Sequence, residues 1–227
     1  MNNSSFKDTN IYPILFMLVT CMFFVGILAT MYRGSEKRID EYNRNSYQKL
    51  VLDLLSESIS DKTGISPDDI MGNYPKSYGN YVKESTLPGL NNRIFAAVID
   101  SEIIGYCVEI KGKGLWGSMK ALVALSSDMK NLKGLSIFEQ METPGLGARI
   151  GEEWFLTQFR DIRIVKEDGV AGDYLNSFEL IPEGKKADNS LQIQQVTGAT
   201  ITTASVTKML RDELNSIYHA FKGQAKL

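Results

Sequence analysis

Residues 191–221, LQIQQVTGATITTASVTKMLRDELNSIYHAF, decide the fold of the soluble part of the chain. The first six residues are strand-like, the next four form a turn of small residues, and an amphipathic helix follows from near Thr202. Apolar residues recur along that helix at spacings of three and four, opposite a charged face. The apolar stripe comprises Val206, Met209, Leu210, Leu214, Ile217, Tyr218 and Phe221, and the charged face comprises Lys208, Arg211, Asp212 and Glu213.

Short apolar, β-branched runs upstream of this helix predict the sheet that it covers. Residues 94–99 and 103–110 flank a polar turn and predict a hairpin, and residues 122–125 and 132–138 repeat the pattern. Further strands are expected at 162–165 and 178–181, with a short helix at 152–159 that carries Trp154, Phe155 and Phe159. The predicted fold class is therefore α+β, an antiparallel or mixed sheet with covering helices.

The N-terminal part of the chain predicts a membrane anchor. Residues 11–32 contain no charged side chain, and about 22 helical residues span roughly 33 Å, enough for a bilayer core. A cleaved signal peptide is the alternative, but the apolar run is long and no clear small-x-small cleavage site follows it. We expect an uncleaved transmembrane helix in the lipid bilayer.

The chain then divides into four predicted segments. Residues 34–60 carry apolar side chains at helical spacing and indicate an amphipathic connecting helix, whereas residues 61–81 are rich in turn residues and are expected to cross the surface. The predicted segments are a tail at 1–10, the transmembrane helix at 11–32, a connecting helix and linker at 33–80, and the main domain at 81–227.

Composition excludes several classes of function. The net charge is −2 and the basic residues are scattered, so we expect no nucleic-acid partner. The single histidine, His219, and the two cysteines, Cys21 and Cys107, cannot form a four-ligand zinc or iron–sulfur site within the chain, and both thiols are expected to be free. Nucleotide-binding and hydrolase motifs are missing from the sequence, so we predict neither a metal site nor catalytic residues.

The turn Thr197-Gly198-Ala199-Thr200 is the best candidate for a ligand site. A helix that begins beside this turn presents backbone N–H groups and the positive end of its dipole, which suits a phosphate. Gly198 and Ala199 permit close backbone approach, and Thr200 offers a hydroxyl. The alternative is that these threonines only cap the helix.

Three segments, in order along the chain, resemble the FMN-binding domain family. Thr197-Gly198-Ala199-Thr200 is similar to the S/T-G-A-T flavinylation motif, Gly114-Leu115-Trp116 resembles a segment of the C-type member of the sodium-translocating NADH:quinone oxidoreductase, and residues 142–147 read E-T-P-G-L-G as in that family. The resemblance implies covalent FMN, joined to Thr200 through a phosphoester. Gln194 and Gln140 stand where the family commonly has an acidic residue and a histidine.

The resemblance also implies a set of cofactor-binding residues. These are Thr200, Thr197, Gly198, Ala199, Trp116, Leu115, Glu142, Thr143, Gly145, Leu146 and Gly147. Without the resemblance, Pro144-Gly145 would be read as a type II turn and Trp116 as a core residue. With it, we expect Trp116 to stack near the isoalloxazine ring.

By this resemblance, the chain is expected to be an electron-transfer subunit of a membrane NADH:quinone oxidoreductase coupled to sodium translocation, and not a complete catalyst alone. The expected partners are the other subunits of that complex and a flavin transferase. The alternatives are the G-type member of an Rnf-type ferredoxin:NAD oxidoreductase and a membrane-tethered binding module without a cofactor. The resemblance implies a single-pass protein of the bacterial inner membrane with a periplasmic domain, although Arg33, Lys37 and Arg38 favour a cytoplasmic domain by the positive-inside rule.

Overall fold

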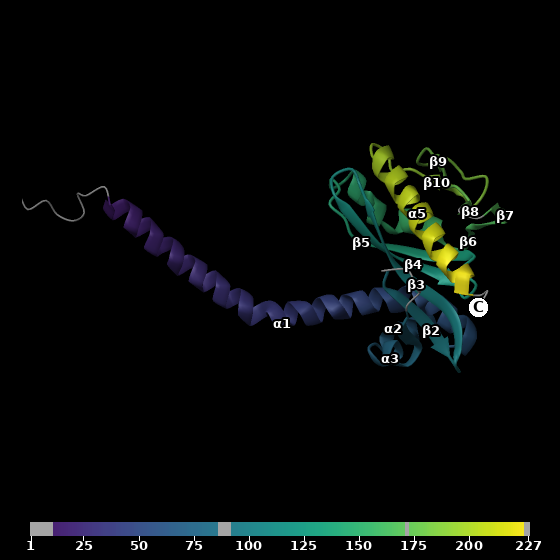
Figure 1. Cartoon of the computed structure of the whole chain (residues 1–227), viewed down its shortest axis with the longest axis horizontal. Coiled ribbons are helices and arrows are strands. Elements are labelled where there is room, and N and C mark those ends of the chain that lie inside the picture. The colour runs from purple at the N-terminus through teal and green to yellow at the C-terminus, as the bar shows by residue number, and fades with distance from the viewer. Residues whose placement is uncertain (1–10, 86–91, 171–172, 225–227) are drawn as a thin grey trace, which may run out of the picture. The chain divides into compact units, whose positions relative to one another are not determined.

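The computed structural model describes residues 11–85, 92–170 and 173–224. The predicted tail at residues 1–10 lies outside these ranges. The chain divides into two compact units, Met1–Tyr47 and Gln48–Leu227 (Figure 1). The boundary falls inside helix α1 (Ile11–Thr63), so one continuous helix contributes residues to both units.

Helix α1 contains the predicted transmembrane segment. Pro13 is tolerated because it lies in the first turn, where its missing N–H costs no helical hydrogen bond. In the described residues, α1 is the one helix that is long and apolar enough to cross a membrane. The expected connecting helix is the second half of this same helix, and residues 51–59 of it carry the buried side chains Val51, Leu52, Leu55, Ser56 and Ile59.

The centre of the second unit is a six-stranded antiparallel sheet with the strands in sequence order. Its strands are β1 (Val82–Ser85), β2 (Ile94–Ile99), β3 (Glu102–Lys113), β4 (Ser118–Ser126), β5 (Asn131–Glu139) and β6 (Ile162–Arg163). Both predicted hairpins are confirmed. In the first hairpin, Asp100 and Ser101 have φ of 49° and 66°, the two positive values that a type I′ turn requires.

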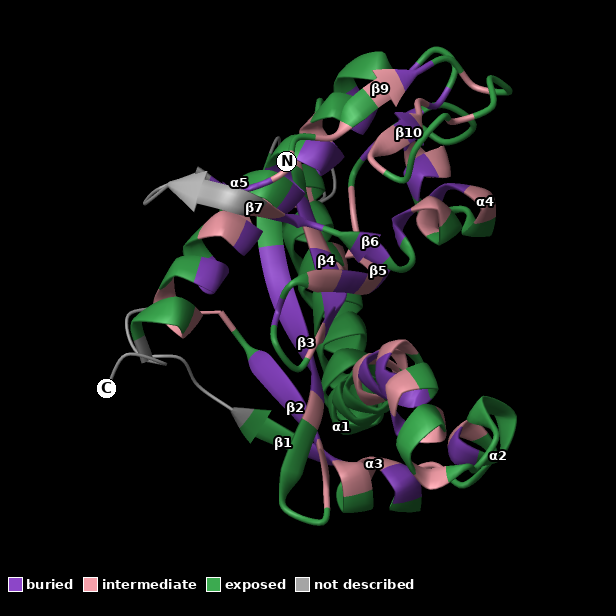
Figure 2. Cartoon of the chain, turned by 90° about the vertical axis from the view of Figure 1, so that its right-hand side faces the viewer, coloured by how far each residue is buried: buried purple, intermediate pink, exposed green. Residues whose placement is uncertain are grey.

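Helices cover both faces of this sheet (Figure 2). Alternation along β3 sends Val108 and Ile110 toward helix α5 (Thr200–Gln224), in one core with Val206 and Leu210. The glycines of β3 show the two faces: a Cβ on Gly112 would collide with Met209 of α5, whereas one on Gly105 would approach Ser58 of α1. The predicted α+β class, a sheet covered by helices, is confirmed. The last helix begins at Thr200, two residues before the predicted start.

Shorter elements complete the second unit. Residues 61–81, expected to be surface turns, contain helices α2 (Pro67–Gly72) and α3 (Lys76–Tyr81); Ser66 caps α2 by accepting the Asp69 N–H. The predicted helix at 152–159 is α4 (Glu153–Leu156) continued by η3 (Thr157–Phe159), after η2 (Gly147–Gly151). Two small sheets pair β7 (Val165–Val170) with β8 (Asp173–Leu175), and β9 (Glu179–Ile181) in parallel with β10 (Gln192–Gln194).

Burial in the second half of α1 gives a direct test of its part in the fold. Leu55 is fully buried, so Leu55→Ala should lower the free energy of unfolding by about 2–5 kcal/mol through lost contacts and a residual cavity. Ile39→Ala, on the exposed part of the same helix, is the matched control and should change it by less than about 0.5 kcal/mol. Urea unfolding of the full chain in detergent measures both, and equal effects would mean that residues 51–59 are not part of the core.

Candidate functional site

Three segments surround a cavity of about 460 Å³ in the second unit. They are the hairpin loop Gly114-Leu115-Trp116-Gly117 between β3 and β4, the loop after β5, and the first turn of α5. The lining residues are Leu115, Trp116, Glu142, Thr143, Leu146, Gly147, Gly198, Ala199, Thr200, Ile201 and Thr202. Nine of the eleven predicted site residues line this cavity. Thr197 and Gly145 lie beside lining residues, and Ile201 and Thr202 were not predicted.

The loop after β5 makes the tight turn that its sequence predicts. Gly145 has a φ of +74°, and the Leu146 N–H donates to the Thr143 carbonyl at 3.1 Å. These are the features of a type II turn with Pro144 and Gly145 at its centre. The turn places Thr143 and Leu146 in the wall of the cavity.

The side chain of Glu142 joins the three segments. Its Oε2 accepts a hydrogen bond from the Thr202 hydroxyl at 2.6 Å, and its Oε1 accepts the Trp116 N–H at 3.1 Å. Only 6% of Glu142 is exposed, so these bonds replace the water that a buried carboxylate loses. A Cβ on Gly114 would collide with Oε1, and one on Gly147 would lie 2.8 Å from Oε2. Glycine at both positions therefore makes room for the carboxylate.

The turn before α5 is held from inside, and Thr200 faces outward. Gly198 has a φ of +77°, and a Cβ there would come within 3.1 Å of Leu146. The Thr203 hydroxyl accepts the Val196 N–H and donates to the Ala199 carbonyl, each at 3.1 Å, and so acts as the inner cap of the helix. Thr200 is exposed, and within the described part of the chain its hydroxyl has no hydrogen-bond partner.

The first turn of α5 is also the most favourable place for an anion in this cavity. The opening N–H groups of a helix have no partner one turn earlier, and the helix dipole places partial positive charge there. Thr200, Ile201 and Thr202 all line the cavity. The arrangement can hold a phosphate at the helix end, with apolar contacts from Leu115, Trp116 and Leu146 farther along.

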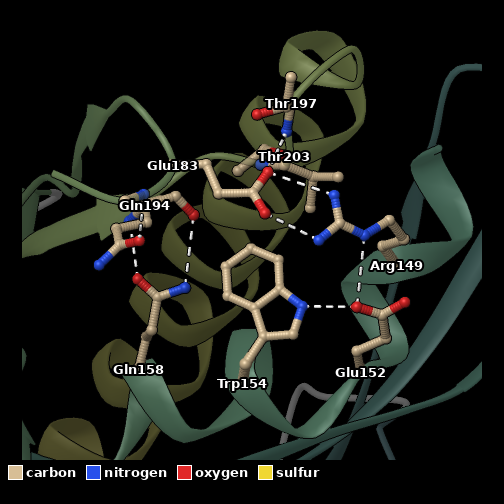
Figure 3. A network of polar contacts seen from close by, with 10 residues as sticks. Arg149, Glu152, Trp154, Gln158, Glu183, Gln194, Thr197 and Thr203 are labelled. Atoms are coloured by element: carbon tan, nitrogen blue, oxygen red, sulfur yellow. Dashed lines mark hydrogen bonds and ion pairs between the residues drawn. The ribbon is translucent and has the colours of Figure 1, made fainter. Parts of the chain in front are cut away.

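A second polar cluster lies behind the turn (Figure 3). The Arg149 guanidinium contacts both oxygens of Glu183, with Nη2 to Oε1 at 2.8 Å and Nη1 to Oε2 at 3.2 Å. Oε2 also accepts the Thr197 N–H at 2.8 Å. Arg149 and the bonds from Thr197 lower the pKa of Glu183 to about 2, and the same ion pair raises the pKa of Arg149.

Gln194 also supports this region through backbone contacts. Its N–H donates to Gln158 Oε1 at 2.7 Å, and its own Oε1 accepts the Gly184 N–H at 2.8 Å. The second bond ties β10 to the chain that carries Glu183. Sequence reasoning missed Arg149 and Glu183, because they lie 34 residues apart and only the tertiary fold brings them together.

Comparisons with known proteins agree with this geometry. The family described as FMN-binding domain matches residues 114–215, a range that includes all three segments of the cavity. The chain is 32% identical over 123 residues to the G-type member of the proton-translocating ferredoxin:NAD(+) oxidoreductase complex from Clostridium ljungdahlii, covering 54% of this chain and 58% of that protein. It is 29% identical over 105 residues to the C-type member of the Na(+)-translocating NADH-quinone reductase from Vibrio anguillarum, covering 46% and 39%. The chain thus spans less than two thirds of these relatives.

Solved structures share the fold. The C-type member of the Na(+)-translocating NADH-quinone reductase from Parabacteroides distasonis superposes with a TM-score of 0.55 at 22% identity, covering 79% of this chain and 94% of that one. NqrC from Shewanella oneidensis gives 0.52 at 21% identity, covering 66% and 73%. At these identities the likeness establishes the fold.

The depressed pKa of Glu183 predicts how acid affects stability. A carboxyl with a pKa of about 2 in the folded chain and an ordinary value of 4.5 stabilises the fold above about pH 5 and loses this contribution as the pH falls from 4.5 toward 2. Glu183→Gln should therefore lower the thermal midpoint most near pH 6, and the difference from the unsubstituted chain should shrink over that acid range. Glu41→Gln, on the exposed part of α1, is the control. A Glu183→Gln difference that is constant with pH would contradict the ion pair.

Proposed function

Because residues 114–215 belong to the FMN-binding domain family, we propose that the cavity beside α5 binds FMN and that the chain is an electron-transfer subunit of a membrane NADH:quinone oxidoreductase coupled to sodium translocation. The observation that carries the proposal is the cavity itself, since the three segments that resemble the family lie far apart in sequence and meet around one space.

The residues present fit the cofactor. A volume of about 460 Å³ lies within the range of about 300–1,000 Å³ that small-molecule and cofactor sites occupy. The helix end suits the phosphate, and Gly198 leaves backbone open beside it. Leu115, Trp116 and Leu146 supply apolar surface for a planar ring, with Trp116 offering a face for stacking.

We further propose that FMN is attached covalently, through a phosphoester to Thr200. The support is local: the Thr200 hydroxyl is exposed at the first residue of α5 and is not engaged as a cap, because Thr203 has that role. The proposed attachment puts the phosphate at the positive end of the helix. It also keeps a carrier in an open site that would otherwise exchange with solvent.

Each segment of the site then has a distinct task. Bound FMN supplies the electron-transfer chemistry, and the protein orients it and sets its surroundings. Glu142 holds the Trp116 loop against α5, so that the apolar wall and the phosphate end keep a fixed separation. Thr143 and the backbone of the tight turn form the opposite wall, and Thr197 to Ala199 form the close backbone approach.

Apolar side chains around the cavity mouth suit a protein partner. Leu115, Trp116, Leu146 and Ile201 line the cavity with between 46% and 70% of each residue exposed. Met141 is 68% exposed and lies against the Gly117 position. An exposed apolar cluster beside a cofactor is typical of a docking surface. We propose that neighbouring subunits of the complex dock here to exchange electrons, and that a flavin transferase loads the site beforehand.

The proposed attachment predicts the mass of one peptide. In the chain from its native host, the tryptic peptide that contains Thr200 should carry the mass of FMN less water. Thr200→Ala should abolish that mass, whereas Thr197→Ala should retain it because Thr197 offers its backbone to the site. An unmodified Thr200 peptide from native membranes would refute covalent attachment.

The second candidate function is that of the G-type member of a ferredoxin:NAD oxidoreductase, which the relative at 32% identity favours. We also propose a periplasmic domain on a single-pass anchor in the bacterial inner membrane. Protease treatment of sealed, right-side-out vesicles, with affinity purification from a matched untreated sample, tests both. We expect the domain to be cleaved and the other quinone reductase polypeptides to co-purify. A protected domain would reverse the sidedness, and ferredoxin-dependent partners would favour the second function.

A further inference from the structure

The ion pair between Arg149 and Glu183 touches the acceptor turn without lining the cavity. Arg149 comes from η2, after the 142–147 loop, and Glu183 comes from the connection between β9 and β10. The two meet at Thr197, three residues before Thr200. These side chains therefore contact the turn from behind and leave its cavity side open.

We propose that Arg149 and Glu183 are positioning residues for the covalent loading of Thr200, acting through the backbone N–H of Thr197. The inference rests on the proposed function, since it concerns how the acceptor threonine is presented. A carboxylate at this place provides what the turn needs, a strong acceptor for an N–H that lies just outside the helix.

The geometry is suited to fixing one conformation of the turn. The planar guanidinium engages both carboxylate oxygens, which sets the direction of the Glu183 side chain as well as its distance. Arg149 is itself held by Glu152 at 3.3 Å and lies 5.3 Å from the centre of the Trp154 ring. Figure 3 shows these side chains meeting beside Thr197 and Thr203.

Fixing Thr197 also fixes the neighbours that expose the acceptor. Gly198 follows with a φ of +77°, a conformation that glycine leaves readily when nothing holds it. Ala199 then closes the turn by donating to the Val196 carbonyl at 2.9 Å, and Thr200 begins the helix. With Thr197 held, the Thr200 hydroxyl keeps its outward position. Without it, the turn samples conformations in which the hydroxyl is less available.

The loading step is a transfer of the FMN moiety from FAD, catalysed by the flavin transferase. The Thr200 oxygen bonds to the phosphorus of the FMN phosphate, the P–O bond to the adenylate group breaks, and AMP leaves. The hydroxyl proton passes to a base of the transferase. No oxidation or reduction occurs, and the ion pair takes part only by presenting the acceptor.

Initial rates of loading measure this role. The full chain in detergent, expressed without transferase, is incubated with purified transferase, FAD and Mg²⁺, and the modified fraction is followed by intact mass. We expect Glu183→Ala to lower the initial rate about tenfold. Glu102→Ala is the matched control, because it removes a different surface ion pair, with Lys62 at 2.6 Å, and should leave the rate unchanged.

A charge swap separates positioning from simple stabilisation. Arg149→Glu combined with Glu183→Arg restores an ion pair, but arginine has only donors and cannot accept the Thr197 N–H. We expect the swap to recover the thermal midpoint and not the loading rate. Hydrogen exchange at the Thr197 amide should rise in both Glu183→Ala and the swap. If Glu183→Ala does not fold, Glu183→Gln keeps an oxygen for Thr197 and should show an intermediate rate.

The outcomes distinguish this inference from the proposed function. Wild-type loading at Thr200 together with normal loading of Glu183→Ala, or with full rescue by the swap, would overturn the positioning role and leave the flavin site intact. Failure of the wild-type chain to be loaded at Thr200, with a transferase that is active on another substrate, would overturn both.

Discussion

The buried carboxylate of Glu142 is the interaction on which the site depends. It accepts hydrogen bonds from the Trp116 N–H and the Thr202 hydroxyl, and so joins a hairpin loop to a helix that begins 83 residues after it ends. A carboxylate in this position is tolerated because its oxygens are satisfied, and losing either partner would leave a buried charge without compensation. The glycines at 114 and 147 follow from the same constraint, since a side chain at either position would occupy the space of the carboxylate.

Helix α5 links this constraint to the rest of the fold. Its apolar stripe packs on β3, which fixes the position of the whole helix, and its first residue then lies at the cavity. The sheet itself is held from its other face by the end of α1. The core therefore sets where the helix dipole ends, and the loops arrange ligand contacts around that point. A phosphate-binding helix end of this kind needs no charged side chain, because the backbone supplies the donors.

Local patterns predicted much of this arrangement. Alternating apolar residues and the Asp100-Ser101 turn gave the first hairpin, the helical stripe gave α5, and Pro144-Gly145 gave the tight turn. Resemblance to the family then picked out nine residues that line one cavity. The parts missed are those that depend on tertiary contacts. Nothing near Arg149 or Glu183 signals their pairing, the end of α1 was read as a connector although it is core, and turn residues at 61–81 hid two short helices whose tertiary packing outweighs local propensity.

The central claim is that a flavin occupies the cavity and is bonded to Thr200. The most direct measurement is an experimental density map of the chain purified from its native membrane. Our account predicts continuous density from the Thr200 oxygen through a phosphate at the start of α5, ending in a planar ring beside Trp116 and Leu146. A well-resolved map with a free Thr200 hydroxyl and only water in the cavity would contradict it.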